Sequence, residues 1–259
     1  MLILDCENPA STLKSISTIY GIPDREIAAF LKAFDIEKYY EKNITDDYPD
    51  RVLTAAFEAK YNAEPKPLDS VCWFHLTRTL PGNNFSAGIL PLPASLNILW
   101  ETLFMLFKDS PHSQNLKNLK SLDLISERYQ SRIKHPYLAG PYAVLVRDVA
   151  FRAKEIGFHD NLAMPETLTD ICDRYQAIHK VNIFAQLQEK LVPCIIKFVS
   201  DRKIDRSCIE SALYYLYVLE HNEQLTESAN TCFDGRNEKI SPKQIKSVEF
   251  LFAHVIKSC

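Results

Sequence analysis

The stretch CWFHLTRTLPGNNFSAGILPL, residues 72–92, joins a β-prone run with polar side chains to a second apolar run through a glycine turn. Because side chains alternate along a strand, His75 and Thr77 are expected to share one face. The opposite face then carries Phe74, Leu76 and Arg78. A polar strand face of this kind is suited to line a cleft, where an imidazole pairs with ribose hydroxyls.

The composition predicts a globular protein. The chain has 259 residues, of which 46% are hydrophobic and 24% charged, and this is enough to bury a substantial core. The formal net charge of −3 provides no overall basic field. Binding to nucleic acid would therefore need a local basic patch.

The seven cysteines are an odd number, widely scattered, with no CxxC pair and no close Cys/His spacing. They are expected to be reduced thiols in the cytoplasm, with no metal bound. No apolar run approaches the roughly 20 residues that a bilayer span needs, and the start lacks the basic leader of a secretory signal. No membrane association is expected.

The chain is expected to divide into a helical N-terminal segment, residues 1–66, and an α+β domain, residues 67–259. Two prolines in residues 62–68 favour an extended linker at that boundary. Ser11-Thr12, Pro23-Asp24 and Pro49-Asp50 are expected to start the three N-terminal helices. Beyond the linker, β-prone runs at 71–78, 87–92, 142–149, 194–199 and 246–250 alternate irregularly with helical patterns at 96–107, 114–132, 167–179 and 208–221. This mixture predicts an α+β fold with helices around the sheet.

Common catalytic signatures are absent from the sequence: the P-loop pattern, GxGxxG, HExxH and GxSxG do not occur. With six glycines in the whole chain, a glycine-rich phosphate cradle is not expected.

The motif FHLTR followed by GILPL resembles the first two strands of ADP-ribosyltransferases of the His-Tyr-Glu type. The resemblance implies that His75 binds the adenosine-side ribose of NAD and that the backbone around Leu76 and Thr77 holds the nicotinamide amide. The family often has His-Gly-Thr where this chain has His-Leu-Thr. A leucine leaves less room for the ligand than a glycine does.

Two further positions follow from the same resemblance. In AGPYAVLVRDV, Tyr142 would stack on nicotinamide, with Tyr137 as the second candidate. In the tail TESANTCFDGRNEKISPKQIKSVEF, the ISPKQI motif resembles the Ile-Pro-Pro-x-x-Ile ending of such enzymes. Glu227 would stabilise the positive charge that develops as nicotinamide leaves, with Glu223 and Glu238 as competing candidates.

A separate acidic position opens a predicted helix in FHDNLAMPETLTDICDRY. Pro165 fits the first helical turn, and Glu166 is favoured at the positive end of the helix. Helix capping accounts for Glu166, and it is not included among the expected catalytic residues.

The resemblance implies a split β-sheet core and an enzyme that uses NAD as co-substrate, without a metal. The enzyme would transfer ADP-ribose to a protein or a nucleic acid. Such a glycosyltransferase would be a toxin in bacterial antiviral defence, with an antitoxin as partner. The alternatives are a degenerate member of the fold that binds a nucleotide or a partner without catalysis, and an unrelated α+β protein.

Overall fold

The computed structural model describes residues 1–121, 127–135 and 138–252. The chain has an α+β fold, as the sequence predicts. Its elements in chain order are β1 (Ile3–Leu4), α1 (Pro9–Tyr20), α2 (Asp24–Ala33), α3 (Ile36–Lys42), α4 (Pro49–Tyr61), β2 (Ser70–Thr79), α5 (Leu92–Leu106), α6 (Ser113–Ser121), α7 (Glu127–Lys134), β3 (Tyr142–Val144), η2 (Arg147–Phe151), α8 (Glu166–His179), α9 (Phe184–Lys190), β4 (Val192–Ser200), α10 (Arg206–Glu220), η3 (Glu227–Ala229), β5 (Cys232–Asp234), η4 (Pro242–Gln244) and β6 (Ile245–Phe250), where η denotes a 3-10 helix.

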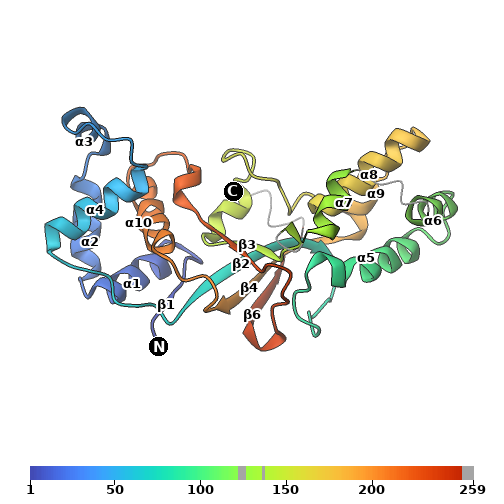
Figure 1. The fold of residues 1–259 in the computed structure, drawn as a ribbon, viewed down its shortest axis with the longest axis horizontal. Coiled ribbons are helices and arrows are strands. Elements are labelled where there is room, and N and C mark those ends of the chain that lie inside the picture. The colour runs from blue at the N-terminus through green and yellow to red at the C-terminus, as the bar shows by residue number, and fades with distance from the viewer. Residues whose placement is uncertain (122–126, 136–137, 253–259) are drawn as a thin grey trace. The chain divides into compact units, whose positions relative to one another are not determined.

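The strands form a six-stranded sheet in the order β5-β3-β2-β4-β6, and β1 pairs with β2 (Figure 1). β1 runs parallel to β2, with Ile3 opposite Ser70. β3 runs antiparallel to β2, with Phe74 opposite Val144. β2 is therefore paired with three strands that are far apart in the sequence.

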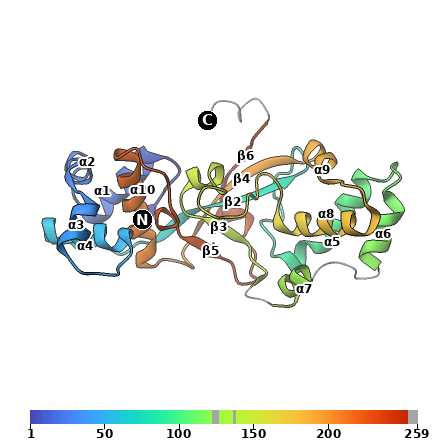
Figure 2. The ribbon, with the colours of Figure 1, turned by 90° about the horizontal axis from the view of Figure 1, so that it is seen from above.

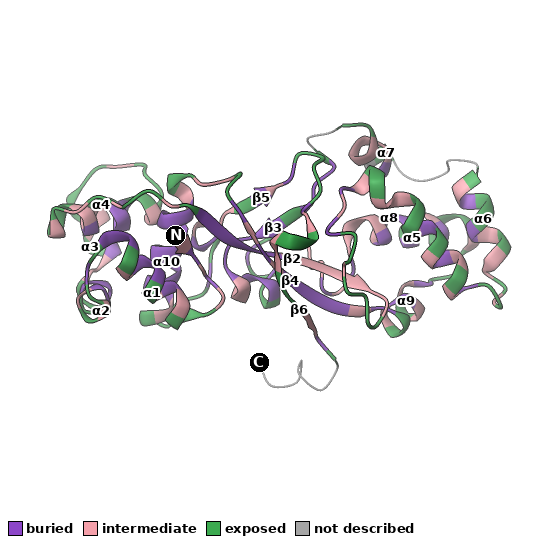
Figure 3. Ribbon diagram, turned by 90° about the horizontal axis from the view of Figure 1, so that it is seen from below, coloured by how far each residue is buried: buried purple, intermediate pink, exposed green. Residues whose placement is uncertain are grey.

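The chain forms two compact units. Unit 1 comprises residues 1–74, 143–158 and 197–233, and unit 2 comprises residues 75–142, 159–196 and 234–259. In unit 1, α1, α2 and α4 pack against α10. Every residue of α10 from 208 to 218 is buried, and Figure 3 shows this helix coloured as buried along most of its length. A helix that is buried on all sides forms the centre of a core.

Unit 2 has a core of its own, made by α5, α6, α8 and α9 with Tyr129 of α7 (Figure 2). Trp100 and Phe107 of α5 and Tyr175 of α8 are among its largest buried side chains. The indole Nε1–H of Trp100 donates a hydrogen bond to the Tyr129 hydroxyl at 3.1 Å, so the polar atom of this buried ring is satisfied.

Local sequence signals account for the ends of the N-terminal helices. Asn8 caps α1 and forms a reciprocal capping box with Ser11, and Gly21 ends the helix in the left-handed conformation. The sequence predicts a cap at Ser11-Thr12, but Ser11 lies within the first turn. Pro49 occupies the first turn of α4, as predicted, and Asn62 ends that helix in the left-handed conformation.

Two predicted strands are shorter in the structure. In residues 87–92 only Ile89 makes a β-bridge, to Ile240, and α5 begins at Leu92. The strand predicted over 142–149 ends at Val144. Beyond Val144, the backbone N–H of residue 145 donates both to the Thr231 carbonyl and to the side-chain oxygen of Asn230, which also accepts from the N–H of residue 146.

Other elements differ from the sequence-based expectation. The helix predicted over 114–132 appears as α6 and α7, with residues 122–126 outside the described chain. The sequence did not predict β1, α3, α9 or β5. The segment 1–66, expected to be helical, thus also contributes a strand to the sheet. Residues 62–68, the predicted domain boundary, contain no helix or strand.

Candidate functional site

The predicted site residues His75 and Tyr142 lie next to each other in unit 2. His75 comes from β2 and Tyr142 starts β3, and His75 Nδ1 lies 2.7 Å from the backbone oxygen of Tyr142. Since a carbonyl oxygen only accepts, Nδ1 carries the proton. Burial lowers the pKa of His75, which favours the neutral ring. The Nε2 atom of a neutral ring with this tautomer is a hydrogen-bond acceptor.

The sequence stretches that carry the family resemblance meet in the same unit. The backbone groups of Ile89 and Ile240 exchange two hydrogen bonds, of 3.0 and 2.9 Å. The N–H groups of Gly235 and Asn237 donate to the carbonyls of Pro141 and Gly140, each at 2.9 Å. The GILPL and ISPKQI motifs are thus joined, and the segment before β6 is joined to the turn that leads into Tyr142.

Glycine is required at the closest of these approaches. Gly88 has φ +82°, and a Cβ atom there would lie 2.0 Å from the backbone oxygen of Ile240. A Cβ atom on Gly235 would lie 2.5 Å from the Pro141 ring. Both glycines allow two backbone segments to approach more closely than any side chain would permit.

Tyr142 is 45% exposed as a residue, so part of it is accessible to solvent. Burial of the rest raises the pKa of its hydroxyl, and the carboxylates of Asp234 and Glu166 raise this pKa further. Glu166 starts α8, as the sequence predicts for an acidic residue at a helix N-terminus. Its carboxylate forms an ion pair of 2.8 Å with Arg132, which also binds the buried Asp170 at 2.6 Å.

Thr77 and Arg78 occupy opposite faces of β2 by the alternation of the strand. Thr77 is half-buried, and within the described residues its hydroxyl donates only a long hydrogen bond of 3.5 Å, to the carbonyl of Arg78. The guanidinium of Arg78 instead donates to three backbone carbonyls, those of Leu162 at 2.7 Å, Gln188 at 2.6 Å and Leu191 at 2.6 Å. Arg78 therefore has a structural role in unit 2 that the sequence did not indicate.

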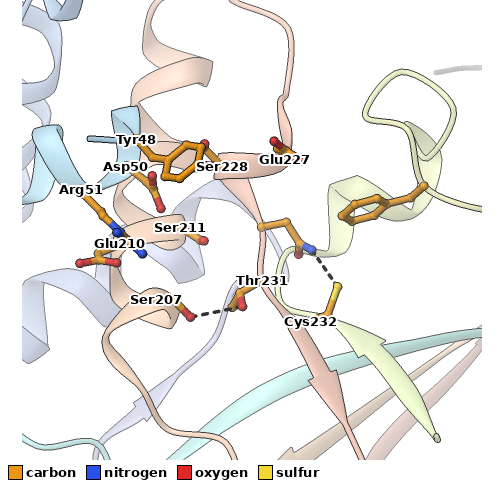
Figure 4. A pocket seen from close by; sticks show the side chains of 12 residues that line it. Tyr48, Asp50, Arg51, Ser207, Glu210, Ser211, Glu227, Ser228, Thr231 and Cys232 are labelled. Carbon is orange, nitrogen blue, oxygen red and sulfur yellow. Dashed lines mark hydrogen bonds between the residues drawn. The ribbon is translucent and has the colours of Figure 1, made fainter. Parts of the chain in front are cut away.

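The predicted catalytic Glu227 belongs to unit 1, where it lines a pocket with a volume of about 400 Å³. Figure 4 shows Asp50 and Arg51 entering the pocket from α4, and Ser211 from α10. Glu227 and Ser228 reach it from η3, just before β5.

Most other groups in the pocket wall are held by the fold. The Ser207 hydroxyl donates to the Thr231 hydroxyl at 3.2 Å, and the Glu210 carboxylate accepts from Arg206 Nε at 2.8 Å. The side-chain oxygen of Asn230 accepts from the two backbone N–H groups that follow β3, those of residues 145 and 146. Among the described lining residues, Tyr48, Asp50, Arg51, Ser211, Glu227 and Ser228 keep side-chain hydrogen-bonding capacity for a ligand.

The predicted site residues are therefore divided between the units. His75, Thr77, Tyr142 and the competing Glu238 belong to unit 2, whereas Glu227 and the competing Glu223 belong to unit 1. The catalytic role of Glu227 stays a prediction. The second tyrosine candidate, Tyr137, lies outside the described residues.

Sequence reasoning missed Asp50 and Ser211 as candidate ligand-binding residues. Asp50 carried the only signal, as an acidic residue in the first turn of a predicted helix, and that pattern is common in helices without a binding role. Ser211 lies within a helical pattern that shows no sign of a polar cavity.

Within residues 1–121, 127–135 and 138–252, no group of three or more His, Cys, Asp or Glu side chains could hold a metal ion. None of the helices in this part of the chain has the length and apolar character needed to cross a membrane.

The six cysteines of the described chain are free thiols, five of them buried, and Cys259 lies beyond it. Burial raises the pKa of Cys172 and of Cys194 to about 12, so these two thiols stay protonated.

No protein-family model, curated protein or solved structure matches this chain.

Proposed function

We propose that this protein is an NAD-dependent ADP-ribosyltransferase that binds NAD at His75 and Tyr142. The observation that supports this most directly is the hydrogen bond from His75 Nδ1 to the Tyr142 carbonyl. It links the two residues that the family resemblance assigns to NAD, and it leaves His75 Nε2 as an acceptor for a ribose hydroxyl. The partly exposed ring of Tyr142 offers a surface for the planar nicotinamide.

Cleavage of the nicotinamide–ribose bond also needs a carboxylate, because positive charge develops on the ribose in the transition state. Glu227 is the proposed residue. Glu166 and Glu238 are the alternatives to test, because Glu166 lies close enough to Tyr142 to raise its pKa and Glu238 is in the same unit.

The acceptor of the ADP-ribose would be a protein or a nucleic acid. The proposal includes a toxin role in bacterial defence with an antitoxin partner, in the cytoplasm, where the free cysteines would stay reduced.

The test is incubation of the purified protein with labelled NAD and cell lysate, followed by digestion with nuclease or protease. Label that is lost with nuclease identifies a nucleic-acid acceptor, and label that is lost with protease identifies a protein. Absence of both NAD binding and NAD cleavage in the presence of lysate contradicts the proposal. Binding of NAD without cleavage supports the degenerate, non-catalytic alternative.

Variants separate binding from catalysis. His75→Asn keeps a nitrogen donor near the Tyr142 carbonyl but removes the Nε2 acceptor, so NAD binding should weaken while the fold remains. Glu227→Gln should lower turnover by about 10²–10³-fold with NAD affinity nearly unchanged. The matched control is Glu64→Gln, at an exposed residue of the 62–68 segment. If Glu166→Gln or Glu238→Gln abolishes turnover while Glu227→Gln does not, the catalytic carboxylate is reassigned.

A further inference from the structure

Asp234 of β5 lies directly opposite Tyr142 of β3, its neighbour in the sheet (Figure 2). Two backbone hydrogen bonds fix the register of these strands, from the N–H of Leu145 to the carbonyl of Thr231 at 3.0 Å and from the N–H of Gly235 to the carbonyl of Pro141 at 2.9 Å. Because the residue number falls along one strand as it rises along the other, the strands run antiparallel, and Tyr142 pairs with Asp234. Directly opposite residues place their side chains on the same face of a sheet, with Cβ atoms about 5 Å apart.

The charges around this pair are unbalanced in favour of negative charge. Asp234 forms no ion pair with another described residue, and its Oδ1 atom accepts the backbone N–H of Arg236 at 2.8 Å. Glu166 is paired with Arg132 at 2.8 Å, but the same guanidinium also compensates the buried Asp170 at 2.6 Å. One cation is thus shared by two carboxylates, and the carboxylate of Asp234 has no cationic partner in the described chain.

The hydroxyl of Tyr142 responds to this excess of negative charge. Burial has the largest effect and raises its pKa, Asp234 and then Glu166 raise the pKa further, and Arg132 opposes them by a smaller amount. Charges that disfavour a tyrosinate attract a cation placed beside the same ring. Tyr142 is partly exposed, so a ligand can reach it from solvent, and the face of an aromatic ring itself attracts a cation.

The nicotinamide group occurs in a charged and a neutral form of nearly the same size. In NAD it is a planar pyridinium with one positive charge, whereas in reduced NAD and in free nicotinamide the ring is neutral. Contacts that depend on shape separate these forms poorly, but a carboxylate separates them by Coulomb attraction.

We propose that Asp234 is a specificity-determining residue, which selects the cationic pyridinium ring over a neutral nicotinamide ring at Tyr142. The inference rests on the proposed function in placing nicotinamide at Tyr142. When the bond to ribose breaks, its electron pair stays on the nicotinamide nitrogen and positive charge develops on the ribose. The released ring is then neutral and is no longer attracted by Asp234, which favours its departure.

The test compares two ligand pairs that differ in charge and little in size, 1-methylnicotinamide against nicotinamide and NAD against reduced NAD. Dissociation constants are measured by NMR titration of the whole protein. We expect the wild-type protein to bind the charged member of each pair about three- to tenfold more tightly, as a carboxylate and an aromatic ring at a partly exposed site allow. High salt should reduce this preference, because salt screens the attraction.

Charge-neutralising variants assign the preference to a residue. Asp234→Asn keeps the shape of the side chain and the oxygen that accepts a backbone N–H, so it should keep the melting temperature and remove most of the preference. Glu166→Gln should reduce the preference less, because Arg132 already compensates that charge. The matched control is Asp109→Asn, at a carboxylate of unit 2 with 86% side-chain exposure. This control should keep the full preference.

Turnover distinguishes this role from that of the proposed catalytic carboxylate. Asp234→Asn should raise the KM for NAD without lowering kcat, because the attraction acts on the bound cationic ring and is lost as the ring becomes neutral. Glu227→Gln is expected to lower kcat instead.

Three results would each overturn the inference: no binding of 1-methylnicotinamide to the wild-type protein, equal affinities for the charged and neutral members of the pairs, or an unchanged preference in Asp234→Asn. If one of these is found while NAD is cleaved, the transferase function stands and only the role of Asp234 is wrong. If NAD is neither bound nor cleaved, the transferase function is wrong, whatever the affinity for 1-methylnicotinamide.

Discussion

Burial keeps the His75 ring neutral, against the opposing effect of its hydrogen bond to the Tyr142 carbonyl, which raises the pKa, and the net shift has a consequence for stability. Burial lowers its pKa in the folded chain below the ordinary value of 6.5, so the unfolded chain binds the proton more readily. The contribution of His75 to the free energy of unfolding is therefore complete above about pH 6.5 and is lost as the pH falls through the lower, folded value.

We predict that His75→Asn makes the stability of the protein less dependent on pH between about 7 and 5. The asparagine nitrogen can replace Nδ1 as donor to Tyr142 but does not titrate. Urea unfolding of both proteins at several pH values measures the difference, and the other histidines cancel in the comparison. An identical loss of stability on acidification in both proteins would contradict the neutral state of the half-buried His75.

Gly88 permits the contact between the GILPL and ISPKQI segments, and its replacement tests that contact. In Gly88→Ala the new methyl group would lie 2.0 Å from the Ile240 oxygen, so we expect a loss of at least about 2 kcal/mol in the free energy of unfolding. Gly82→Ala is the matched control, because Gly82 has nearly the same φ, +80°, with no atom within 4 Å of the new methyl group. It should cost only the backbone strain, about 1 kcal/mol. Equal losses, measured by chemical denaturation, would exclude the close approach of Gly88 to Ile240.

At the scale of elements, Arg78 connects the end of β2 to the segments around α9. Its three carbonyl partners come from the loop before α8, from α9 and from the residue that follows α9. Carbonyls at helix ends need partners of this kind, and one planar guanidinium can satisfy several at once.

We predict that Arg78→Met lowers the free energy of unfolding by about 3 kcal/mol, because the carbonyls lose a charged donor and stay partly buried. Hydrogen exchange should become faster in α9 before it does in α5, because α9 and its following residue hold two of the three carbonyl partners and α5 holds none of them. Arg78→Lys should recover only part of the loss, since an ammonium cannot reproduce the forked geometry. Wild-type stability in Arg78→Lys would show that charge alone accounts for the role of this residue.

At the scale of the whole molecule, the first 74 residues belong to the same compact unit as α10. α1, α2 and α4 pack against that helix, and β1 pairs with β2. The helical segment 1–66 would therefore depend on residues near 210 for its core, rather than folding as a separate domain.

Limited proteolysis with thermolysin checks this directly. The first cut is expected within residues 62–68, where the chain has no helix or strand and several residues are exposed. After the cut, the two fragments should elute together in gel filtration, because the contacts with α10 remain. Separation of the fragments under native conditions would support an independent N-terminal domain ending near residue 66.

Local patterns in the sequence determined most of the helices, though not α3 or α9, and the two long strands β2 and β4. Pro49 in a first turn, the apolar spacing of α10 and the β-prone run around Trp73 act over a few residues, where backbone sterics and side-chain periodicity decide the conformation. The sequence also predicted His75 and Tyr142 as candidate site residues, because a polar strand face and a tyrosine after a Gly-Pro turn are visible locally, and the structure places the two next to each other.

Only the tertiary structure decided the features that depend on distant segments. The strand that starts at Tyr142 is short where the side chain of Asn230 accepts from the backbone N–H groups of residues 145 and 146, and β1 forms because it pairs with Ser70 and Val71 at the start of β2. The pocket of Asp50 and Ser211 forms because α4 packs on α10. In each case the energy comes from burying or pairing groups that lie far apart along the chain, and no local pattern records which groups will meet.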